Sequence, residues 1–275
     1  MNEYYNVAGI TMRIAGDVLP YRRPLESFAC APVENPDITF KVYAELADAE
    51  YLYTVSEENP DKKYRVVNYS NNEGIKAVSA IISLDWREVK VYLNPDFFRR
   101  IYFLKWIAEV TFYHICLFRK SIGLHAAAVE YNGGGIAVSA PAGTGKSTHC
   151  DLWVNNFGAE YINGDSPILK IINDEIFILG SPWSGSAEVY KNVCIPLTAI
   201  VFIEQYRENI IEKLSPAEAF KKMMPRCFLS YQNRDMMSLA MDNIEAVIMR
   251  TDCYLLKCTP DLEAAELVRN AIFKK

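Results

Sequence analysis

The chain has 275 residues, 51% hydrophobic and 23% charged, a composition that fits a globular protein of one large or two modest domains. Its 29 basic and 34 acidic residues give a formal net charge of −5, which predicts neither nucleic-acid binding nor attraction to an anionic membrane. Seven cysteines without a C-x-x-C pair, no signal-peptide pattern and no apolar run of roughly 20 residues predict a cytoplasmic protein without a disulfide framework, zinc ribbon or membrane helix.

Short apolar runs separated by Pro, Asn, Asp and Gly occupy the first third of the chain and predict a β-rich accessory domain over residues 1–94. We expect mostly antiparallel strands at 7–14, 37–43, 51–55, 64–69, 75–84 and 89–93. The tyrosines of these strands are expected to form a packing surface rather than a ligand site, because aromatic residues favour strands in general.

The segment Asn94-Pro95-Asp96 predicts a helix start, with Asn94 as the N-cap and Pro95 at the first helical position. The helix is expected to continue to about Arg119, and its dense apolar residues indicate burial between layers. We place the start of a second domain here, over residues 95–275. His114 lies on this helix, where a packed core or boundary histidine is expected rather than a catalytic one.

Strands at 124–131 and 135–139 flank Asn132-Gly133-Gly134, a strong hairpin-turn signal. A helix over 147–157 follows, and then strands are expected at 160–162, 167–172, 176–179 and 197–204. A capping box at Ser215 and the segment Thr259-Pro260-Asp261 each predict a helix start, and the second helix is expected to end near Phe273. This order predicts an α/β core.

The stretch from Ala140 to Thr148 predicts a phosphate-binding loop. Gly143 and Gly145 permit backbone turns that aim successive N–H groups at phosphate oxygens, and the following helix start favours anions. Lys146 is expected to reach the β- and γ-phosphates, and Ser147 to bind Mg²⁺. The residues expected to contact the nucleotide are Ala142, Gly143, Thr144, Gly145, Lys146, Ser147 and Thr148. Ala140 replaces the usual first glycine, and the alternative is a simple turn before a helix.

Two acids compete for the metal or base position that phosphoryl transfer needs. Asp165 follows a short apolar strand, and its alternative is an Asp in a surface turn. Glu204 ends the apolar run 199–203, and its alternative is an acid where a buried strand meets solvent. His125 lies one hairpin before the loop and is either a site residue or a structural histidine. The segment 180–186 either closes over the ligand or connects two strands around a packed Trp183.

Four segments together resemble the catalytic core of the HPr kinase/phosphorylase family, which is similar to ATP-dependent phosphoenolpyruvate carboxykinase. They are Leu124-His125-Ala-Ala-Ala-Val, Ala142-Gly-Thr-Gly-Lys-Ser147, Asn163-Gly-Asp165-Ser-Pro-Ile-Leu and Gly180-Ser-Pro-Trp-Ser-Gly185. The resemblance covers residues 95–275 and implies a P-loop nucleotide-binding core of the HPr kinase/carboxykinase type.

This resemblance implies a kinase that transfers the γ-phosphoryl group of ATP, with Mg²⁺, to a serine or similar hydroxyl. Lys146 and Ser147 match the family's phosphate and metal ligands, and His125 matches its histidine upstream of the loop. The family usually has two adjacent aspartates where this chain has Gly164-Asp165. Asp165 is therefore expected to act as metal ligand, as base, or as both.

A serine of a peptide or protein is the preferred acceptor, and a small hydroxyl metabolite is the second choice. The alternatives are a carboxykinase-like enzyme acting on oxaloacetate and an ATP-binding sensor that transfers no phosphate. Arg226 or Arg234 is a candidate for stabilising transition-state charge, by residue type alone. The sequence leaves a homo-oligomer open.

Overall fold

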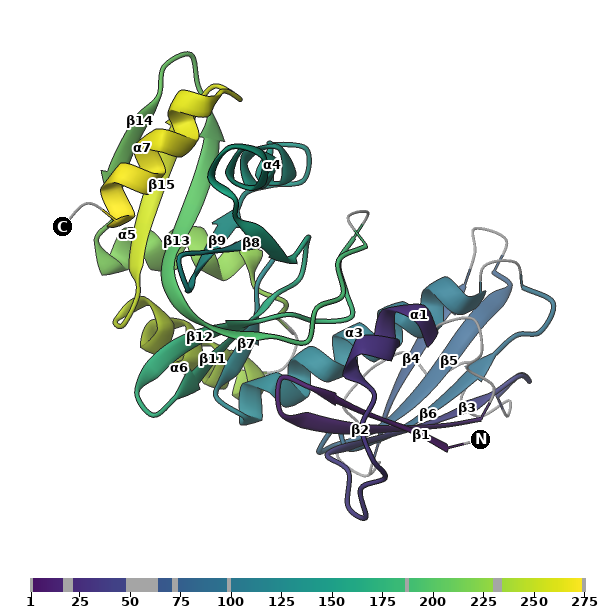
Figure 1. Ribbon diagram of the computed structural model, residues 1–275. Helices are drawn as coiled ribbons and strands as arrows, with labels where there is room; N and C mark the ends of the chain where they lie inside the picture. Colours follow the sequence, from purple (N-terminus) through teal and green to yellow (C-terminus); the bar gives the residue numbers. More distant parts are fainter. Residues whose placement is uncertain are drawn as a thin grey trace. The chain divides into compact units, whose positions relative to one another are not determined.

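The computed structural model describes residues 2–16, 22–47, 64–70, 74–97, 100–185, 188–229 and 234–273. The chain divides into two compact units, Met1–Ile115 and Cys116–Lys275. The division lies within the long helix α3 (Arg100–Phe118), whereas the sequence placed it at 94/95, before that helix. Figure 1 shows both units, and each is described here by itself.

The first unit is built on a six-stranded sheet in the order β1-β2-β3-β6-β5-β4. Its elements are β1 (Asn2–Val7), β2 (Ile10–Gly16), α1 (Arg22–Leu25), η2 (Glu26–Phe28), β3 (Ile38–Tyr43), β4 (Tyr64–Ser70), β5 (Lys76–Ser83) and β6 (Glu88–Leu93). Three strand pairings are antiparallel, while β3 is parallel to both β2 and β6. The sheet is therefore mixed, and most of its pairings are antiparallel, as the sequence predicted.

The strand expected at 7–14 is wrong, because a hairpin turn divides it. Val7 closes β1 and pairs with Ile10 of β2, and the turn between them has positive φ at Ala8 (53°) and Gly9 (77°). Gly tolerates that conformation, so the chain reverses there even though the apolar pattern continues. The expected strand 51–55 lies outside the described residues.

The expected helix start at Asn94 is also wrong, since residues 95–97 form a turn and the described helix α3 begins at Arg100. The Asn94 carboxamide accepts the N–H of Asp96 at 3.0 Å, which closes the turn locally. His114 is buried, as expected, and its ring stacks on Trp86 with centroids 3.7 Å apart.

The second unit contains a nine-stranded sheet in which β10-β8-β9-β13-β12-β11-β7 form one path, with β15 beside β13 and β14 beside β15. Its strands are β7 (Ser121–Gly123), β8 (Ala126–Tyr131), β9 (Gly134–Ser139), β10 (Glu160–Asn163), β11 (Ile168–Ile172), β12 (Glu175–Leu179), β13 (Cys194–Gln205), β14 (Ile210–Lys213) and β15 (Asp252–Cys258). The first residues of β13 pair antiparallel with β12, and the rest lies parallel to β9 and β15. The carboxyl ends of β9, β13 and β15 therefore meet at one edge of the sheet.

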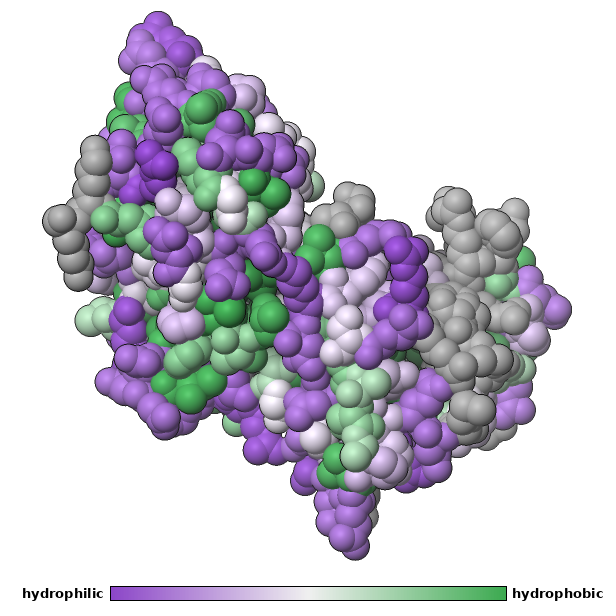
Figure 2. Space-filling model, viewed as in Figure 1, coloured by the Kyte–Doolittle hydropathy of each residue, from purple (hydrophilic) through white to green (hydrophobic). Residues whose placement is uncertain are grey.

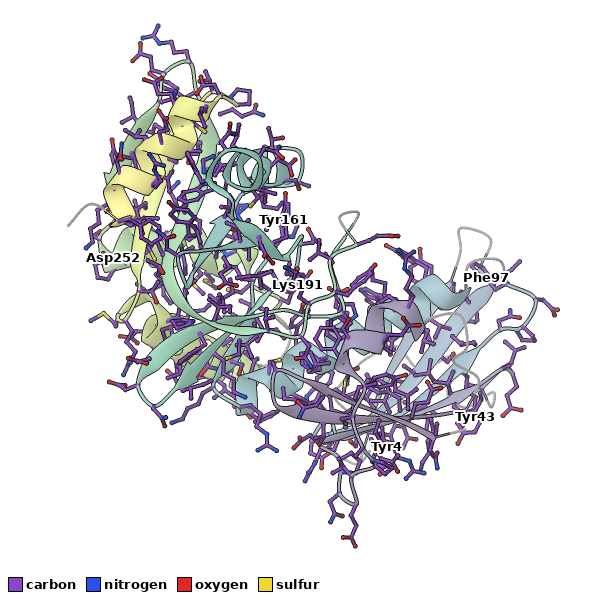
Figure 3. The ribbon with its side chains drawn as sticks, viewed as in Figure 1. Tyr4, Tyr43, Phe97, Tyr161, Lys191 and Asp252 are labelled. Atoms are coloured by element: carbon purple, nitrogen blue, oxygen red, sulfur yellow. The ribbon has the colours of Figure 1, made fainter. Side chains whose placement is uncertain are left out.

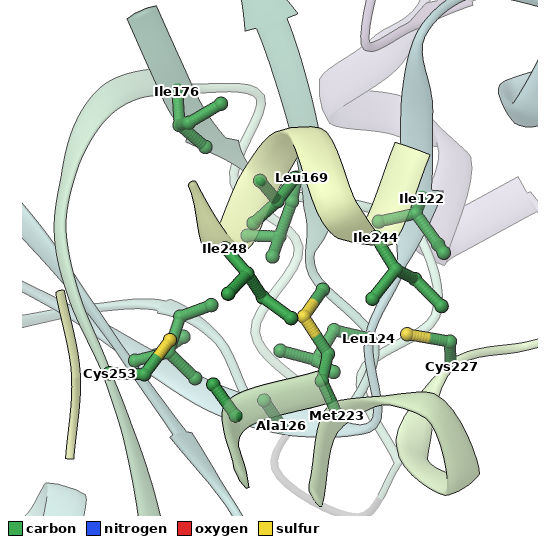
Figure 4. Close-up of a cluster of buried hydrophobic side chains, with 14 of the residues drawn as sticks. Ile122, Leu124, Ala126, Leu169, Ile176, Met223, Cys227, Ile244, Ile248 and Cys253 are labelled. Atoms are coloured by element: carbon green, nitrogen blue, oxygen red, sulfur yellow. The ribbon is translucent and has the colours of Figure 1, made fainter. Parts of the chain in front are cut away.

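Helices cover both faces of this sheet, as Figure 1 shows. The helices are α4 (Lys146–Phe157), α5 (Pro216–Met223), α6 (Arg234–Ile248) and α7 (Leu262–Phe273), with the short η3 (Met224–Arg226) after α5. Alternate residues of β8 point to opposite faces, so Ala127 packs with residues of α4 and α7, and Ala128 packs with residues of α5 and α6. Figure 4 shows the buried hydrophobic cluster on the face covered by α5 and α6.

The predicted hairpin at Asn132-Gly133 is confirmed, with φ of 52° and 76° at these residues between β8 and β9. The capping box of α5 is confirmed by the Ser215 N–H, which donates to the Glu218 carboxylate at 2.9 Å. The strand expected at 124–131 begins only at Ala126. The sequence patterns did not predict β7, α6, β14 and β15.

No helix in the described ranges combines the length and the apolar character needed to cross a membrane. In the view of Figure 2, hydrophilic residues cover most of the surface of each unit, and hydrophobic residues form separate groups between them.

Candidate functional site

The predicted phosphate loop connects β9 to α4 at the edge of the sheet where three strands end. Gly143 has φ of 76° and Gly145 has φ of 117°, conformations that favour glycine, and the helix begins at Lys146. Ser147 in the first turn is exposed, so the helix N-terminus opens to solvent, as anion binding requires. Ala140 is only 1% exposed, and its methyl group packs beneath the loop.

Tyr161 of β10 contacts the beginning of α4. Its hydroxyl lies 2.8 Å from Asp151 Oδ1 and 3.1 Å from the carbonyl oxygen of Ser147 (Figure 3 labels Tyr161). The turn that carries the phosphate loop is thus tied to the strand that leads to Asp165.

Three predicted site residues form a continuous line of close polar contacts. Lys146 Nζ lies 2.9 Å from His125 Nε2 and also donates to the carbonyl oxygen of Ala140 at 3.3 Å. His125 Nδ1 lies 3.2 Å from Asp165 Oδ1. An ammonium can only donate, so His125 Nε2 is the acceptor and Nδ1 carries the proton that faces Asp165. The sequence placed these residues 21 and 40 positions from His125, and the structure brings them together.

The electrostatics of the line agree with a neutral imidazole. Burial lowers the pKa of His125, and the positive charges of Lys146 and Arg226 lower it further, while the carboxylate of Asp165 opposes them. Burial also lowers the pKa of Lys146, with Arg226 adding to the effect and Asp165 opposing it. At neutral pH His125 is therefore neutral, with Nε2 accepting from Lys146 and Nδ1 facing the Asp165 carboxylate.

The backbone around His125 explains why the expected strand starts late. The N–H of His125 donates to the carbonyl oxygen of Arg226 at 2.7 Å in an isolated antiparallel bridge between Leu124 and Cys227, so it takes no part in the pairing of β8 with β9. The next N–H, of Ala126, donates to the carbonyl oxygen of Asp165 at 3.0 Å. These bonds fix both ends of the His125–Asp165 contact.

Asn163 holds the turn that presents Asp165, and the sequence analysis gave it no role of its own. Its side chain is fully buried, and its Oδ1 accepts the N–H groups of Asp165 at 2.9 Å and Ser166 at 2.7 Å. Its Nδ2 donates to the carbonyl oxygen of Ser181 at 3.1 Å. An Asn that bonds backbone N–H groups two and three residues ahead is a known turn signal that the sequence offered.

The segment 180–185 packs against the same turn. Ser184 Oγ accepts the N–H of Gly164 at 3.0 Å. Gly185 has φ of 57°, and a Cβ at this position would lie 3.0 Å from the Cβ of Asp165. Trp183 is 1% exposed, which agrees with the expectation of a packed tryptophan. The described part of this segment therefore supports Asp165.

Glu204, the competing acid, lies outside this line of contacts. It sits near the end of β13 and pairs with Lys222 Nζ at 2.6 Å. Arg226 lies next to the line, since its carbonyl oxygen accepts the N–H of His125 at 2.7 Å, and its charge lowers the pKa of both His125 and Lys146. Arg234 is exposed at the first residue of α6.

In the described part of the chain, no three His, Cys, Asp or Glu side chains cluster closely enough to bind a metal ion by themselves. Mg²⁺ needs no such cluster when it binds with a nucleotide, because it keeps waters and takes one or two carboxylates plus phosphate oxygens. Ser147 and Asp165 offer hard oxygen donors of the kind it prefers, so the residues present fit Mg²⁺.

Comparisons with known proteins give distant similarity to solved structures only. No family model matches the chain, and no curated protein matches it. The solved structure of the Hpr(Ser) kinase/phosphatase from Coxiella burnetii is similar to it, with 13% identity and a TM-score of 0.31, over 54% of this chain and 95% of that chain. A similarity this distant assigns no activity, and we build the functional proposal on the residues of this chain.

Proposed function

We propose that the second unit is an ATP- and Mg²⁺-dependent kinase that transfers the γ-phosphoryl group to a hydroxyl, with a serine of a peptide or protein as the preferred acceptor. The observation that supports this most is the line from Lys146 through His125 to Asp165 beside the glycine-containing loop. It joins a cation suited to phosphate oxygens to a carboxylate suited to a hydroxyl proton, the two groups that phosphoryl transfer needs.

Lys146 is held so that one donor remains for a phosphate. An ammonium has three donors, and His125 Nε2 and the carbonyl oxygen of Ala140 accept two of them. Helix α4 also begins at Lys146, so the N–H groups of its first turn, which lack intrahelical carbonyl partners, lie at the same end of the loop. Bound Mg²⁺·ATP supplies the transferable phosphoryl group and a metal charge that neutralises it.

Asp165 is the proposed base, and His125 positions it. One carboxylate oxygen, Oδ1, faces the imidazole N–H, and the other, Oδ2, lies 3.4 Å from Ser166 Oγ, long for a hydroxyl hydrogen bond. Oδ2 is thus the oxygen that accepts the proton of the attacking hydroxyl or, together with Ser147, binds Mg²⁺. Arg226 adds positive charge near the transferred group.

The test is phosphoryl transfer from γ-labelled ATP with Mg²⁺, measured against serine-containing peptides, small hydroxyl compounds and oxaloacetate. Lys146→Ala is expected to lower the rate about 100-fold or more, because it removes a donor aimed at transition-state charge. Lys213→Ala is the matched control, since Lys213 is an exposed lysine on β14 that pairs with Asp252.

Each outcome has a distinct meaning. Labelled peptide that disappears in Lys146→Ala and persists in Lys213→Ala supports the kinase, and labelling of a small hydroxyl compound changes only the acceptor. Wild-type protein that binds ATP yet labels no acceptor and does not hydrolyse it supports an ATP-binding sensor instead. Retained transfer in Lys146→Ala contradicts the proposal.

A further inference from the structure

A pocket of about 300 Å³ lies beside the line from Lys146 to Asp165 and has no role in the chemistry proposed above. Two residues of its lining are bonded to the backbone of His125. Ser139 Oγ donates to the His125 carbonyl oxygen at 2.8 Å, and the His125 N–H donates to the carbonyl oxygen of Arg226 at 2.7 Å. A ligand in this pocket therefore lies next to the residue that positions the proposed base.

The lining of this pocket carries one positive charge that no acid of the described residues balances. Its charged side chains are Glu204, Lys222 and Arg226. Lys222 pairs with Glu204 at 2.6 Å. Arg226 has no ion pair in the described part of the chain, and its buried Nε has no hydrogen-bond partner there. Because a buried polar group without a partner costs free energy, this guanidinium is expected to bind an anion.

The lining does not suit the phosphates of a nucleotide. Phosphates bind to backbone N–H groups at a helix start, but Gly143, Gly145 and Lys146 are not among the described residues that line this pocket. Pro141, which does line it, has no backbone N–H. One unbalanced positive charge also matches a carboxylate better than a phosphate group, which carries about two negative charges at neutral pH.

We propose that this pocket, the carboxylate pocket, binds an acidic side chain of the acceptor peptide, close in sequence to the serine that receives the phosphoryl group. This inference rests on the proposed function and names a feature of its substrate. The planar guanidinium of Arg226 is suited to a carboxylate, because it donates two parallel hydrogen bonds. An extended peptide advances about 3.3 Å per residue, so an acid within a few residues of a serine at Asp165 is within reach of a pocket that borders His125.

The experiment compares acceptor peptides that differ by one charge. Each peptide has a single serine and carries either aspartate or asparagine at one of the neighbouring positions, and kcat/KM is measured with γ-labelled ATP and Mg²⁺. Wild-type protein is expected to prefer the aspartate form at least about tenfold at the best position, because a hydrogen bond between charged groups is stronger than a neutral one. Arg226→Met is expected to reduce this preference to less than about twofold.

Two further variants test whether the charge of the pocket sets the preference. Arg250→Met is the matched control, since Arg250 pairs with Asp174 and is not among the residues that line this pocket, and it is expected to keep the preference. Glu204→Gln leaves Lys222 without its acid and is expected to increase the preference. If Arg226 acts only on transition-state charge, Arg226→Met slows both peptide forms equally and keeps the preference, which overturns the inference.

Peptides with alanine in place of the serine measure binding when a variant transfers nothing. In calorimetric titrations, tighter binding of the aspartate form that is lost in Arg226→Met supports the carboxylate pocket, and equal binding of both forms by wild-type protein overturns it.

The source of the carboxylate and the proposed function are tested separately. If wild-type protein labels no peptide but labels glycerate in preference to glycerol, and Arg226→Met loses that preference, the acidic peptide is wrong and the carboxylate belongs to a small hydroxy acid. Equal labelling of both peptide forms overturns only this inference, whereas wild-type protein that labels none of these acceptors contradicts the proposed function.

Discussion

Asp165 follows β10 and Glu204 lies near the end of β13, and the structure surrounds the two acids differently. Asp165 faces His125, which in turn accepts from Lys146, and a fully buried Asn163 shapes its turn. Glu204 is about half exposed and pairs with Lys222. An acid already neutralised by a neighbouring lysine is a poor base, whereas an acid oriented by a neutral imidazole keeps an oxygen for chemistry.

The largest expected difference between the two acids is in the rate of phosphoryl transfer after each is replaced by its amide. Asp165→Asn is expected to lower phosphoryl transfer by about 10²–10⁴-fold, because it removes the general base. Glu204→Gln is expected to lower it less than about fivefold, since an exposed ion pair is worth ~1 kcal/mol or less. Initial rates at saturating ATP and Mg²⁺ measure both effects.

The same pair of variants separates the two roles of Asp165. Loss of transfer that excess Mg²⁺ restores identifies a metal ligand, and loss that persists at saturating Mg²⁺ identifies a base. If Glu204→Gln loses at least as much activity as Asp165→Asn, the catalytic carboxylate belongs to β13 and the proposed assignment is wrong.

Substitutions of the residues that bond to the two acids are expected to lower the unfolding free energy by different amounts. Asn163→Ala leaves the buried N–H groups of Asp165 and Ser166 without their acceptor and is expected to cost about 2–4 kcal/mol of unfolding free energy. Lys222→Met breaks only the exposed pair with Glu204 and is expected to cost less than about 1 kcal/mol. Urea denaturation followed by tryptophan fluorescence measures both.

Asn163→Asp keeps an acceptor for the two N–H groups, but it loses the donors to Ser181 and buries a carboxylate. It is therefore also expected to cost more than Lys222→Met. Equal costs for Asn163→Ala and Lys222→Met contradict the claim that the turn at Asp165 is the more rigidly held.

Local features of the site were readable from the sequence, and the choice between the acids was not. Gly143, Gly145 and Lys146 follow a strand and open a helix, an order set by neighbours in the chain. The contact between His125 and Asp165 spans 40 residues, and nothing in either segment shows that Lys222 neutralises Glu204. Contacts between residues far apart in the sequence therefore determine which of the two acids is paired with a lysine.

Some elements that were not predicted have a recognisable pattern in the sequence. In α6, Met236, Ala240 and Ile244 are buried and recur every four residues, a helical spacing that the sequence analysis did not use. The strand expected at 7–14 failed for a different reason, because Ala8 and Gly9 continue the apolar pattern through a turn. Hydrophobic periodicity alone cannot show a reversal made of small apolar residues.

The smallest expected effect is a change in the pKa of His125, measured from its imidazole proton resonances as pH is varied. Asp165→Asn removes the negative charge that raises this pKa, so the pKa is expected to fall further below its ordinary value. Arg226→Met removes a positive charge that lowers it, so the pKa is expected to rise. Glu204→Gln is the control and is expected to leave the titration unchanged.

The sign of the pH effect on activity follows from the same group. Protonation of His125 removes the acceptor for Lys146, so transfer is expected to decline only as pH falls below about 6.5, the ordinary pKa of histidine. Arg226→Met moves that decline to higher pH, because a higher pKa protonates the ring sooner as pH falls. If the pKa of His125 changes in Glu204→Gln and not in Asp165→Asn, the imidazole contacts Glu204 rather than Asp165. The proposed difference between the two acids is then wrong.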